Sequence, residues 1–312
     1  MKRLFYISLL FSSLSLFGQE SHFTQYFNSS TFLNPSLSGI DLKSKATLLY
    51  RNHWPQLENS FVTQAFVYES SLANSNHGLS FYFFNDRAGD GNLAVNSLGV
   101  SYAHEFQLTN QWVLRSGIAS AYAMKSIDWD KLVFEDMIDS REGVVYDSQQ
   151  PRGRNLNYWD VSIGATLFSE KHHFGFSIDH LTEPDEGLVN QQGDATLSRS
   201  YTVHASTRLQ LARRSQSLVP AVIYRQQNNI SLLQLGALAE LENLQFGFWY
   251  GSNQRLIVST GLQLKNFGFT YAYDLYSSKI LNRNLGSHEV SIQYEFESKK
   301  QRRKFRQPCP KF

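Results

Sequence analysis

The chain has 312 residues, of which 42% are hydrophobic, 14% aromatic and 18% charged. It holds no apolar run near 20 residues beyond position 17, which excludes a bundle of membrane-spanning helices. Its aromatic content excludes a disordered chain. A single cysteine excludes disulfide scaffolds and cysteine-based zinc modules. The net charge of +2 combines a basic end, +7 over residues 299–312, with 20 bases against 27 acids over residues 19–298, so the body of the chain gives no reason to expect nucleic-acid binding.

Residues 1–18 predict a secretory signal peptide. Lys2 and Arg3 form a short basic start, the stretch from Leu4 to Phe17 is mostly apolar, and Gly18 supplies a small residue for cleavage. This apolar stretch is too short for a membrane anchor helix. We therefore expect an exported protein whose mature chain begins near Gln19.

From about residue 46 onward, apolar and polar residues alternate with period two. In residues 287–297, for example, Val290 and Ile292 fall on one face of an extended strand, and Glu289 and Ser291 fall on the other. Residues 254–265 follow the same rule except at Ile257, an apolar residue on the polar face. About fourteen strands are predicted, over residues 46–52, 60–71, 77–85, 93–108, 111–125, 156–169, 172–181, 199–213, 217–227, 230–241, 244–251, 254–265, 266–276 and 287–297.

The connections between these strands separate a membrane barrel from a soluble sandwich, which has the same alternation. Tight turns follow the even-numbered strands, as at Asn110 and at residues 242–243. The long connections, 52–59, 86–92, 126–155, 182–198 and 277–286, all follow odd-numbered strands. Short turns on one rim and long loops on the other are typical of bacterial outer-membrane barrels, with the turns in the periplasm and the loops outside the cell.

We therefore predict an all-β fold, a transmembrane antiparallel β-barrel of about 14 strands in the cell outer membrane. The predicted organisation is a signal peptide over 1–18, a periplasmic or lumenal segment over 19–45, the barrel over 46–298 and a basic periplasmic tail over 299–312. Aromatic residues at strand ends are compatible with girdles at the two membrane interfaces; they are Trp112, Trp159, Trp249, Tyr250 and Tyr276.

Six short motifs stand in order along the chain: HFTQYF at 22–27, FLNPSLSG at 32–39, YRNHWP at 50–55, NDRAGDG at 85–91, SYAH at 101–104 and CPKF at 309–312. Their order and spacing resemble the PorP/SprF family of Bacteroidetes outer-membrane proteins. That family usually has Gln where this chain has His53. The segment that begins at Ile127 and Asp128 is similar as well, so the resemblance extends from the signal peptide to the last residue.

The resemblance implies a barrel attached to the type IX secretion system, the export and gliding apparatus of these bacteria. Family members support the export or surface attachment of large adhesins and are regarded as holding an adhesin's C-terminal sorting domain; they are not known as enzymes. We accordingly expect a protein that docks or anchors a secreted adhesin and supports its export and gliding motility. The expected partners are the adhesin or its sorting domain, type IX secretion components and outer-membrane lipid, with no nucleic acid and no cofactor.

Candidate partner contacts stand on the long connections. Arg51 and Trp54 lie at the first, where the alternative is that Arg51 pairs with an acid in the lumen and Trp54 anchors at the membrane interface. Asp86 lies in a glycine-containing loop that offers too few oxygens for calcium and favours a hairpin turn. Residues 126–155 carry the richest set, Trp129, Phe134, Asp136 and Asp139. A loop of this length with aromatic residues either constricts the barrel mouth or contacts a protein.

No catalytic, cofactor-binding or metal-binding residue is predicted. His172, His173, His180 and His204 lie on adjacent predicted strands, but no motif with assignable catalytic roles accompanies them. In the tail, Cys309 indicates either intermolecular pairing or a buried side chain that holds the tail against the barrel or its partner together with Phe312.

Three other functions remain open from the sequence. A general diffusion porin for small solutes would conduct ions after reconstitution in a bilayer. An outer-membrane enzyme would need a set of reactive residues that the sequence does not supply. A soluble secreted all-β protein would be extracted without detergent.

Overall fold

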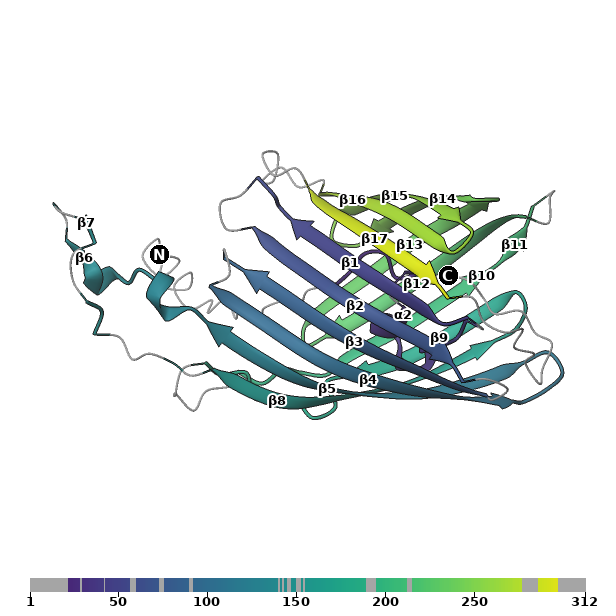
Figure 1. Ribbon diagram of the computed structural model, residues 1–312, viewed down its shortest axis with the longest axis horizontal. Helices are drawn as coiled ribbons and strands as arrows, with labels where there is room; N and C mark the ends of the chain where they lie inside the picture. The colour runs from purple at the N-terminus through teal and green to yellow at the C-terminus, as the bar shows by residue number, and fades with distance from the viewer. Residues whose placement is uncertain are drawn as a thin grey trace, which may run out of the picture.

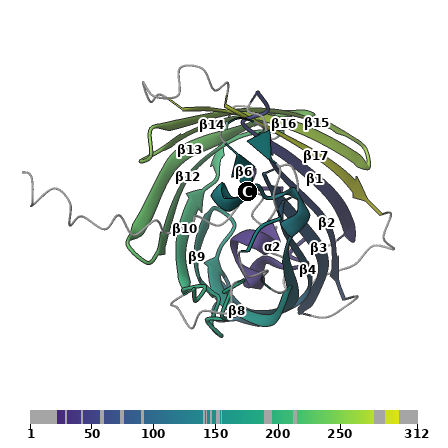
Figure 2. The same ribbon diagram turned by 90° about the vertical axis from the view of Figure 1, so that its left-hand side faces the viewer.

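The computed structural model describes residues 22–28, 30–41, 43–56, 60–72, 76–89, 92–139, 141, 143–144, 147–149, 153, 155–188, 195–211, 215–276 and 286–296. Within these residues the chain forms one closed antiparallel barrel (Figures 1 and 2). The wall consists of β1 (Lys45–His53), β2 (Phe61–Ser71), β3 (His77–Ala88), β4 (Leu93–Gln107), β5 (Val113–Ile127), β8 (Leu156–Phe168), β9 (His172–Asp179), β10 (Ser200–Thr207), β11 (Leu209–Gln210), β12 (Gln216–Gln227), β13 (Ile230–Leu241), β14 (Leu244–Gly251), β15 (Arg255–Leu264), β16 (Phe267–Tyr276) and β17 (Ser287–Glu295).

Each wall strand pairs with the strands before and after it, and the first and last strands close the ring. β1 pairs with β17 from Lys45, opposite Glu295, to His53, opposite Ser287. β10 and β11 are two parts of one strand, interrupted at Arg208, and both pair with β12. The wall therefore has fourteen strands, which confirms the predicted fold class. Closure removes the free sheet edges whose unpaired N–H and C=O groups lipid does not satisfy.

Short elements lie inside the barrel and beyond one of its ends. α2 (Ser30–Leu33) and η1 (Pro35–Leu37) lie in the lumen (Figure 2). Between β5 and β8 come η2 (Trp129–Lys131), η3 (Glu135–Met137), β6 (Ile138–Asp139) and β7 (Gly143–Val144), and β6 and β7 stand well beyond the end of the wall (Figure 1). No helix in the described ranges is long and apolar enough to cross a bilayer.

The outer surface of the wall is apolar and its inner surface is polar. On β4, Val100 is 57% exposed and faces outward, whereas Ser101 and Glu105 face the lumen and are buried. On β14, Phe246 and Phe248 face outward in the same way. A soluble sandwich buries its apolar faces, so this inverted arrangement is that of a barrel whose outside contacts lipid.

The connections are sorted between the two rims as the sequence predicts. One rim, the short-turn rim, has connections no longer than residues 72–76, 108–112 and 211–215. The opposite rim, the long-loop rim, bears residues 128–155, between β5 and β8, and residues 180–199, between β9 and β10. In Figure 1 the long-loop rim is on the left, where β6 and β7 project.

Two residues, Trp249 and Asp86, differ from their predicted places, and the exception at Ile257 is explained. Trp249 was expected in an interfacial girdle, but it faces the lumen with 5% of its surface exposed. Ile257, the exception to the alternation, is buried in the same lumenal cluster as Trp249. Asp86 was expected in a turn, but β3 continues to Ala88 because Asp86 remains paired with Thr63 on one side and with Val95 on the other.

Because the outer wall contacts lipid, the loss of stability caused by a charged substitution is expected to depend on its depth in the bilayer. Val100 lies at the middle of β4, so Val100→Arg is expected to lower the free energy of unfolding in lipid vesicles by about 2–4 kcal/mol, because it places a cation at the bilayer midplane. Leu108→Arg, at the short-turn rim, is the matched control, with an expected loss of about 0–1 kcal/mol. Urea titration followed by tryptophan fluorescence measures both, and equal losses would contradict the inferred membrane position.

Candidate functional site

Residues 22–28 and 30–41, here called the plug, run through the lumen and carry α2 and η1. Asn34 begins η1: its side chain accepts a hydrogen bond from the backbone N–H of Ser36 at 2.9 Å, and Pro35 follows at the first helical position. Backbone of this irregular kind is stable at membrane depth only where the protein satisfies its polar groups. The wall supplies those partners from several strands.

Glu289 on β17 anchors the beginning of the plug. Its carboxylate accepts hydrogen bonds from the backbone N–H of Thr24 at 2.7 Å, from the Thr24 hydroxyl at 2.8 Å and from the backbone N–H of Gln25 at 2.9 Å. The side chain of Gln25 donates in return to the carbonyl oxygen of Glu289 at 3.1 Å. Hydrogen bonds to an ionised acceptor are about twice as strong as neutral ones, so Glu289 attaches the beginning of the plug firmly.

Glu289 also belongs to a buried charge cluster, here called the lumenal ion cluster. Arg51 on β1 contacts Glu289 at 3.2 Å and Asp274 on β16 at 2.8 Å, and Arg255 on β15 also contacts Asp274. The two arginines balance the two carboxylates. A buried charge is tolerated when it is paired in this way, and removal of one partner leaves another charge uncompensated.

Arg115 on β5 holds the middle of the plug. Its guanidinium donates to the carbonyl oxygen of Ser36 at 2.6 Å and to that of Ser38, and it pairs with Glu105 on β4 at 3.3 Å. The planar, multidentate guanidinium suits this task because it reaches two carbonyls and a carboxylate together. Arg115 is 2% exposed, so it acts inside the lumen.

Further polar contacts surround the plug. Thr31 donates to Glu69 on β2 at 2.6 Å, and Lys45 pairs with the same carboxylate at 3.3 Å. Asn34 reaches the opposite part of the wall, where its amide nitrogen donates to the carbonyl oxygen of Phe176 on β9 at 3.1 Å and lies 3.1 Å from the ring of His204 on β10. The plug is therefore attached to strands on all sides of the ring.

Two glycines let η1 approach the wall closely. Gly117 on β5 is paired with Gly164 on β8. A Cβ atom on Gly117 would lie 2.3 Å from the backbone nitrogen of Ser36, and one on Gly164 would lie 2.0 Å from the side-chain oxygen of Asn34. No side chain fits at either position without displacement of the plug.

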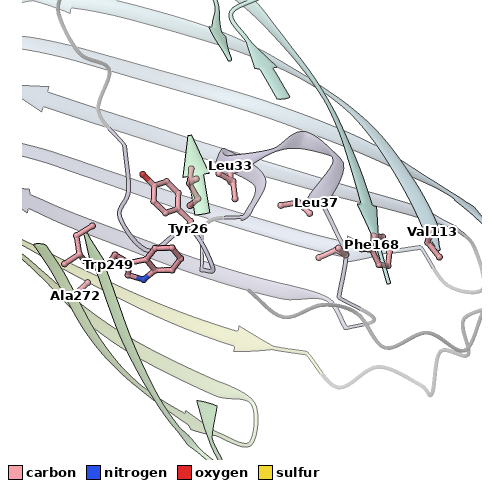
Figure 3. Packing of buried hydrophobic residues seen from close by; sticks show 10 residues of the cluster. Tyr26, Leu33, Leu37, Val113, Phe168, Trp249 and Ala272 are labelled. Atoms are coloured by element: carbon pink, nitrogen blue, oxygen red, sulfur yellow. The ribbon is translucent and has the colours of Figure 1, made fainter. Parts of the chain in front are cut away.

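An apolar cluster seals the space between the plug and the wall (Figure 3). From the plug, Tyr26, Leu33 and Leu37 are buried in it. From the wall come Val113, Phe168, Ile223, Trp249, Ile257 and Ala272, on strands around the ring. Together with the polar contacts, this packing closes the lumen at the level of α2 and η1.

A cavity of about 360 Å³ remains on the long-loop side of the plug. Its lining includes plug residues such as Phe23 and Phe32, wall residues such as Asp86, and Glu186 from the β9–β10 connection. Lys125 at 2.8 Å and the hydroxyl of Tyr158 at 2.6 Å both bind the carboxylate of Glu186. These bonds tie that connection to β5 and β8 at the edge of the cavity.

The described residues of the β5–β8 connection are linked by hydrogen bonds from side-chain carboxylates to nearby loop groups. The carboxylate of Asp136 accepts hydrogen bonds from the hydroxyl of Ser148 at 3.1 Å and from the backbone N–H of Gln149 at 2.8 Å. Asp139 accepts from the backbone N–H of Arg141 at 2.7 Å. Trp129 and Phe134 are half-buried within it. All four residues predicted here therefore lie together on one loop, where the aspartates brace the backbone.

The other predicted site residues lie elsewhere. Arg51 is buried in the lumenal ion cluster, which matches the alternative that it pairs with lumenal acids. Trp54 has a positive φ of 56° and packs against His53, with ring centroids 4.1 Å apart. Asp86 accepts a hydrogen bond from the Thr63 hydroxyl at 2.6 Å and lines the cavity. Cys309 and Phe312 fall outside the described residues.

The sequence did not single out the charged residues that hold the plug, Glu289 and Arg115, or Asp274, which pairs with Arg51 and Arg255 in the lumenal ion cluster. One signal was available: acids and arginines recur at lumen-facing positions of strands, where an empty pore would not need so many. Their partners were not visible, because the plug lies 265 positions away from Glu289 along the chain.

No reactive constellation accompanies these groups. His173 and His204 lie side by side in the lumen, with ring centroids 4.9 Å apart. Among the described residues no group of three or more His, Cys, Asp or Glu side chains is placed to hold a metal ion. The polar contacts and the apolar packing described above hold the plug in the lumen, and the cavity lies on its long-loop side.

Comparison with known proteins agrees with this architecture. Residues 15–294 match the family described as the type IX secretion system membrane protein PorP/SprF. Among curated proteins, no sequence matches this chain.

Two solved structures resemble the fold. The toluene transporter TbuX of Ralstonia pickettii is 11% identical, with a TM-score of 0.51 over 86% of this chain and 94% of that chain. The monoaromatic hydrocarbon channel CymD is 11% identical, with a TM-score of 0.50 over 88% of this chain and 94% of that chain. At this identity the likeness concerns the fold alone, an outer-membrane barrel. Neither the family description nor these two structures names an enzyme.

The first prediction from the site concerns the plug anchor. Glu289→Ala is expected to lower the free energy of unfolding by about 3–5 kcal/mol, because it removes one of the two carboxylates that pair with Arg51 and leaves two plug N–H groups without their acceptor. Glu295→Gln, on the same face of β17, is the control: its partner Lys43 is exposed, so the expected loss is about 0–1 kcal/mol. Urea titration in detergent measures both, and a loss for Glu289→Ala no larger than that of the control would contradict this anchoring role.

The second prediction concerns closure of the lumen. Gly117→Val is expected to displace η1, because the new side chain meets plug backbone, and so to raise ion conductance in planar bilayers. The neighbouring Ile118→Val faces lipid and is expected to conduct no more than the natural protein. A folded Gly117→Val barrel that stays closed would show that the plug does not seal the lumen.

Proposed function

Because the chain belongs to the PorP/SprF family of type IX secretion system membrane proteins and forms an outer-membrane barrel, we propose that it holds a secreted adhesin at the cell surface. The docked part is the adhesin's C-terminal sorting domain, and docking supports export of the adhesin and gliding. Association with other secretion components follows from membership of the family.

The observation that carries the proposal is the apolar surface of the β5–β8 connection. Val133, Ile138 and Val144 are each more than half exposed, although they lie beyond the wall. Exposed apolar side chains that gather on one projecting, ordered loop are typical of protein contact surfaces. Ile138 and Val144 are paired across the β6–β7 hairpin, so they form one patch.

The residues predicted from the sequence fit around this patch in different ways. Trp129 and Phe134 pack within the loop, and Asp136 and Asp139 brace it, so they shape the contact surface. Trp54 and Asp86 lie at the same rim, and we propose them as secondary contacts. Arg51 supports the arrangement from inside through the lumenal ion cluster. Cys309 and Phe312 remain proposed contacts of the tail.

The closed lumen favours an anchor over the alternative, a general diffusion porin. A porin needs a continuous water-filled path, whereas here the plug packs against β5, β8, β12, β14, β15 and β16 in one apolar cluster and against β1, β2 and β3 in another. A plugged barrel offers a rigid base on which a bound protein is held without loss of the permeability barrier.

This proposal predicts which surface retains the partner. The triple variant Val133→Ser, Ile138→Ser and Val144→Ser is expected to lower the amount of co-purified surface protein about tenfold or more, because it removes apolar contact area while the barrel stays intact. Trp159→Ala, an exposed residue of β8 on the lipid side, is the control and is expected to retain the partner.

The measurement is quantitative mass spectrometry of proteins that co-purify with the barrel from mildly solubilised outer membranes. Heat-modifiable migration in gel electrophoresis verifies that each variant is folded. Undiminished retention by the folded triple variant would reject the β5–β8 connection as the docking surface. A natural protein that purifies without a large surface protein and conducts ions would favour the porin.

A further inference from the structure

The cavity on the long-loop side of the plug, here called the vestibule, has features that the anchoring role described above does not use. Its volume of about 360 Å³ lies within the roughly 300–1,000 Å³ typical of ligand pockets. It is bounded by the plug, by lumen-facing residues of β3, β4, β5 and β8, and by the β9–β10 connection. Three different kinds of lining meet in it.

One part of the lining is aromatic. Phe23 and Phe32 from the plug meet Tyr82 and Phe84 from β3, and the ring centroids lie between 5.0 and 6.2 Å apart. Part of this cluster packs against buried residues of β1 and β2, which fixes its position. Aromatic surfaces of this kind bind apolar side chains and, through their negative faces, attract cations.

A second part is lined by small residues. Ala119, Ala121 and Ala123 occupy successive lumen-facing positions along β5, and all three line the vestibule. Their methyl groups leave room beside the strand for an extended backbone, because larger side chains would fill that space.

The third part is acidic. The lining contains four carboxylates, those of Asp86, Asp160, Asp179 and Glu186, against two permanent cations, Lys125 and Arg225. Lys125 pairs with Glu186 at 2.8 Å, which offsets one of the acids. His180 lies 2.7 Å from the carboxylate of Asp160. The lining thus holds more carboxylates than permanent cations, and its narrow protein walls strengthen the attraction of a cation compared with open water.

We propose that the vestibule binds an extended, lysine- or arginine-bearing apolar segment of the docked protein. The cation of that segment lies near Asp86 and Asp179, and the flanking apolar side chains lie on the aromatic cluster. This inference rests on the proposed function, because it takes the ligand from the protein held at the long-loop rim. A neutral hydrocarbon fits the aromatic part alone and makes no use of the acidic part of the lining.

Site-specific photocrosslinking in the native outer membrane tests the proposal. The photoreactive amino acid p-benzoylphenylalanine replaces Phe84 in the vestibule, Phe83 on the lipid side of the same strand, or Phe134 on the β5–β8 connection, one at a time. The expected result is a protein adduct from positions 84 and 134 but not from 83. Mass spectrometry of the position-84 adduct should identify a crosslinked peptide that contains Lys or Arg beside apolar residues.

Charge removal tests the acidic part in the same assay. Asp86→Asn combined with Asp179→Asn preserves side-chain size and is expected to lower the position-84 adduct about tenfold or more, in line with the loss of a close charge pair at an interface. Glu183→Gln, an exposed acid of the β9–β10 connection that pairs with Arg199, is the control and should leave the adduct unchanged.

The outcomes separate the two proposals. An adduct from position 134 with none from 84 would overturn the vestibule proposal and leave the docking function standing. An adduct at 84 whose peptide lacks a basic residue, or that survives the double substitution in a folded barrel, would also overturn it. A small-molecule adduct at 84 would assign the vestibule to a solute instead, and no protein adduct at either position would count against the docking function itself.

Discussion

An irregular segment of backbone at membrane depth is stable only where protein groups satisfy its N–H and C=O groups, and the closed lumen depends on that condition. Glu289 meets it for the N–H groups of Thr24 and Gln25, and Arg115 meets it for the carbonyls of Ser36 and Ser38 in and after η1. Both are charged groups that would be unfavourable in a dry interior without partners. The plug and the wall therefore stabilise each other. The wall supplies hydrogen-bond partners to the plug backbone, and the plug supplies partners to buried charged groups of the wall.

This mutual dependence explains why the lumen combines buried ions with an apolar cluster. The charged groups fix the orientation of the plug, since Glu289 and Arg115 make directional hydrogen bonds to its backbone. The apolar cluster around Trp249 and Ile257 excludes water from the seal. A barrel with either feature alone would hold its plug less specifically, because apolar packing lacks direction and ion pairs in a wet pore are weak.

In the proposed function, the barrel with its plug is the base that supports the contact surfaces of the long-loop rim. The β5–β8 connection projects an apolar patch, and the vestibule beneath it adds aromatic and acidic surface inside the same mouth. A partner bound at both places would contact an outer surface, the apolar patch, and an inner pocket, the vestibule.

Local sequence determined the wall, because period-two alternation and loop length are properties of neighbouring residues. It predicted the fourteen strands, the sorting of the loops and the lumenal pairing weighed for Arg51. It misplaced Trp249 and gave no reason for Ile257, since both depend on contact with a segment more than 200 positions away. Only the tertiary structure decided that the lumen is filled and where the vestibule lies. The reason is physical. Whether a lumen-facing position takes a polar or an apolar side chain depends on which part of the plug it contacts, and the alternation along one strand does not indicate that contact.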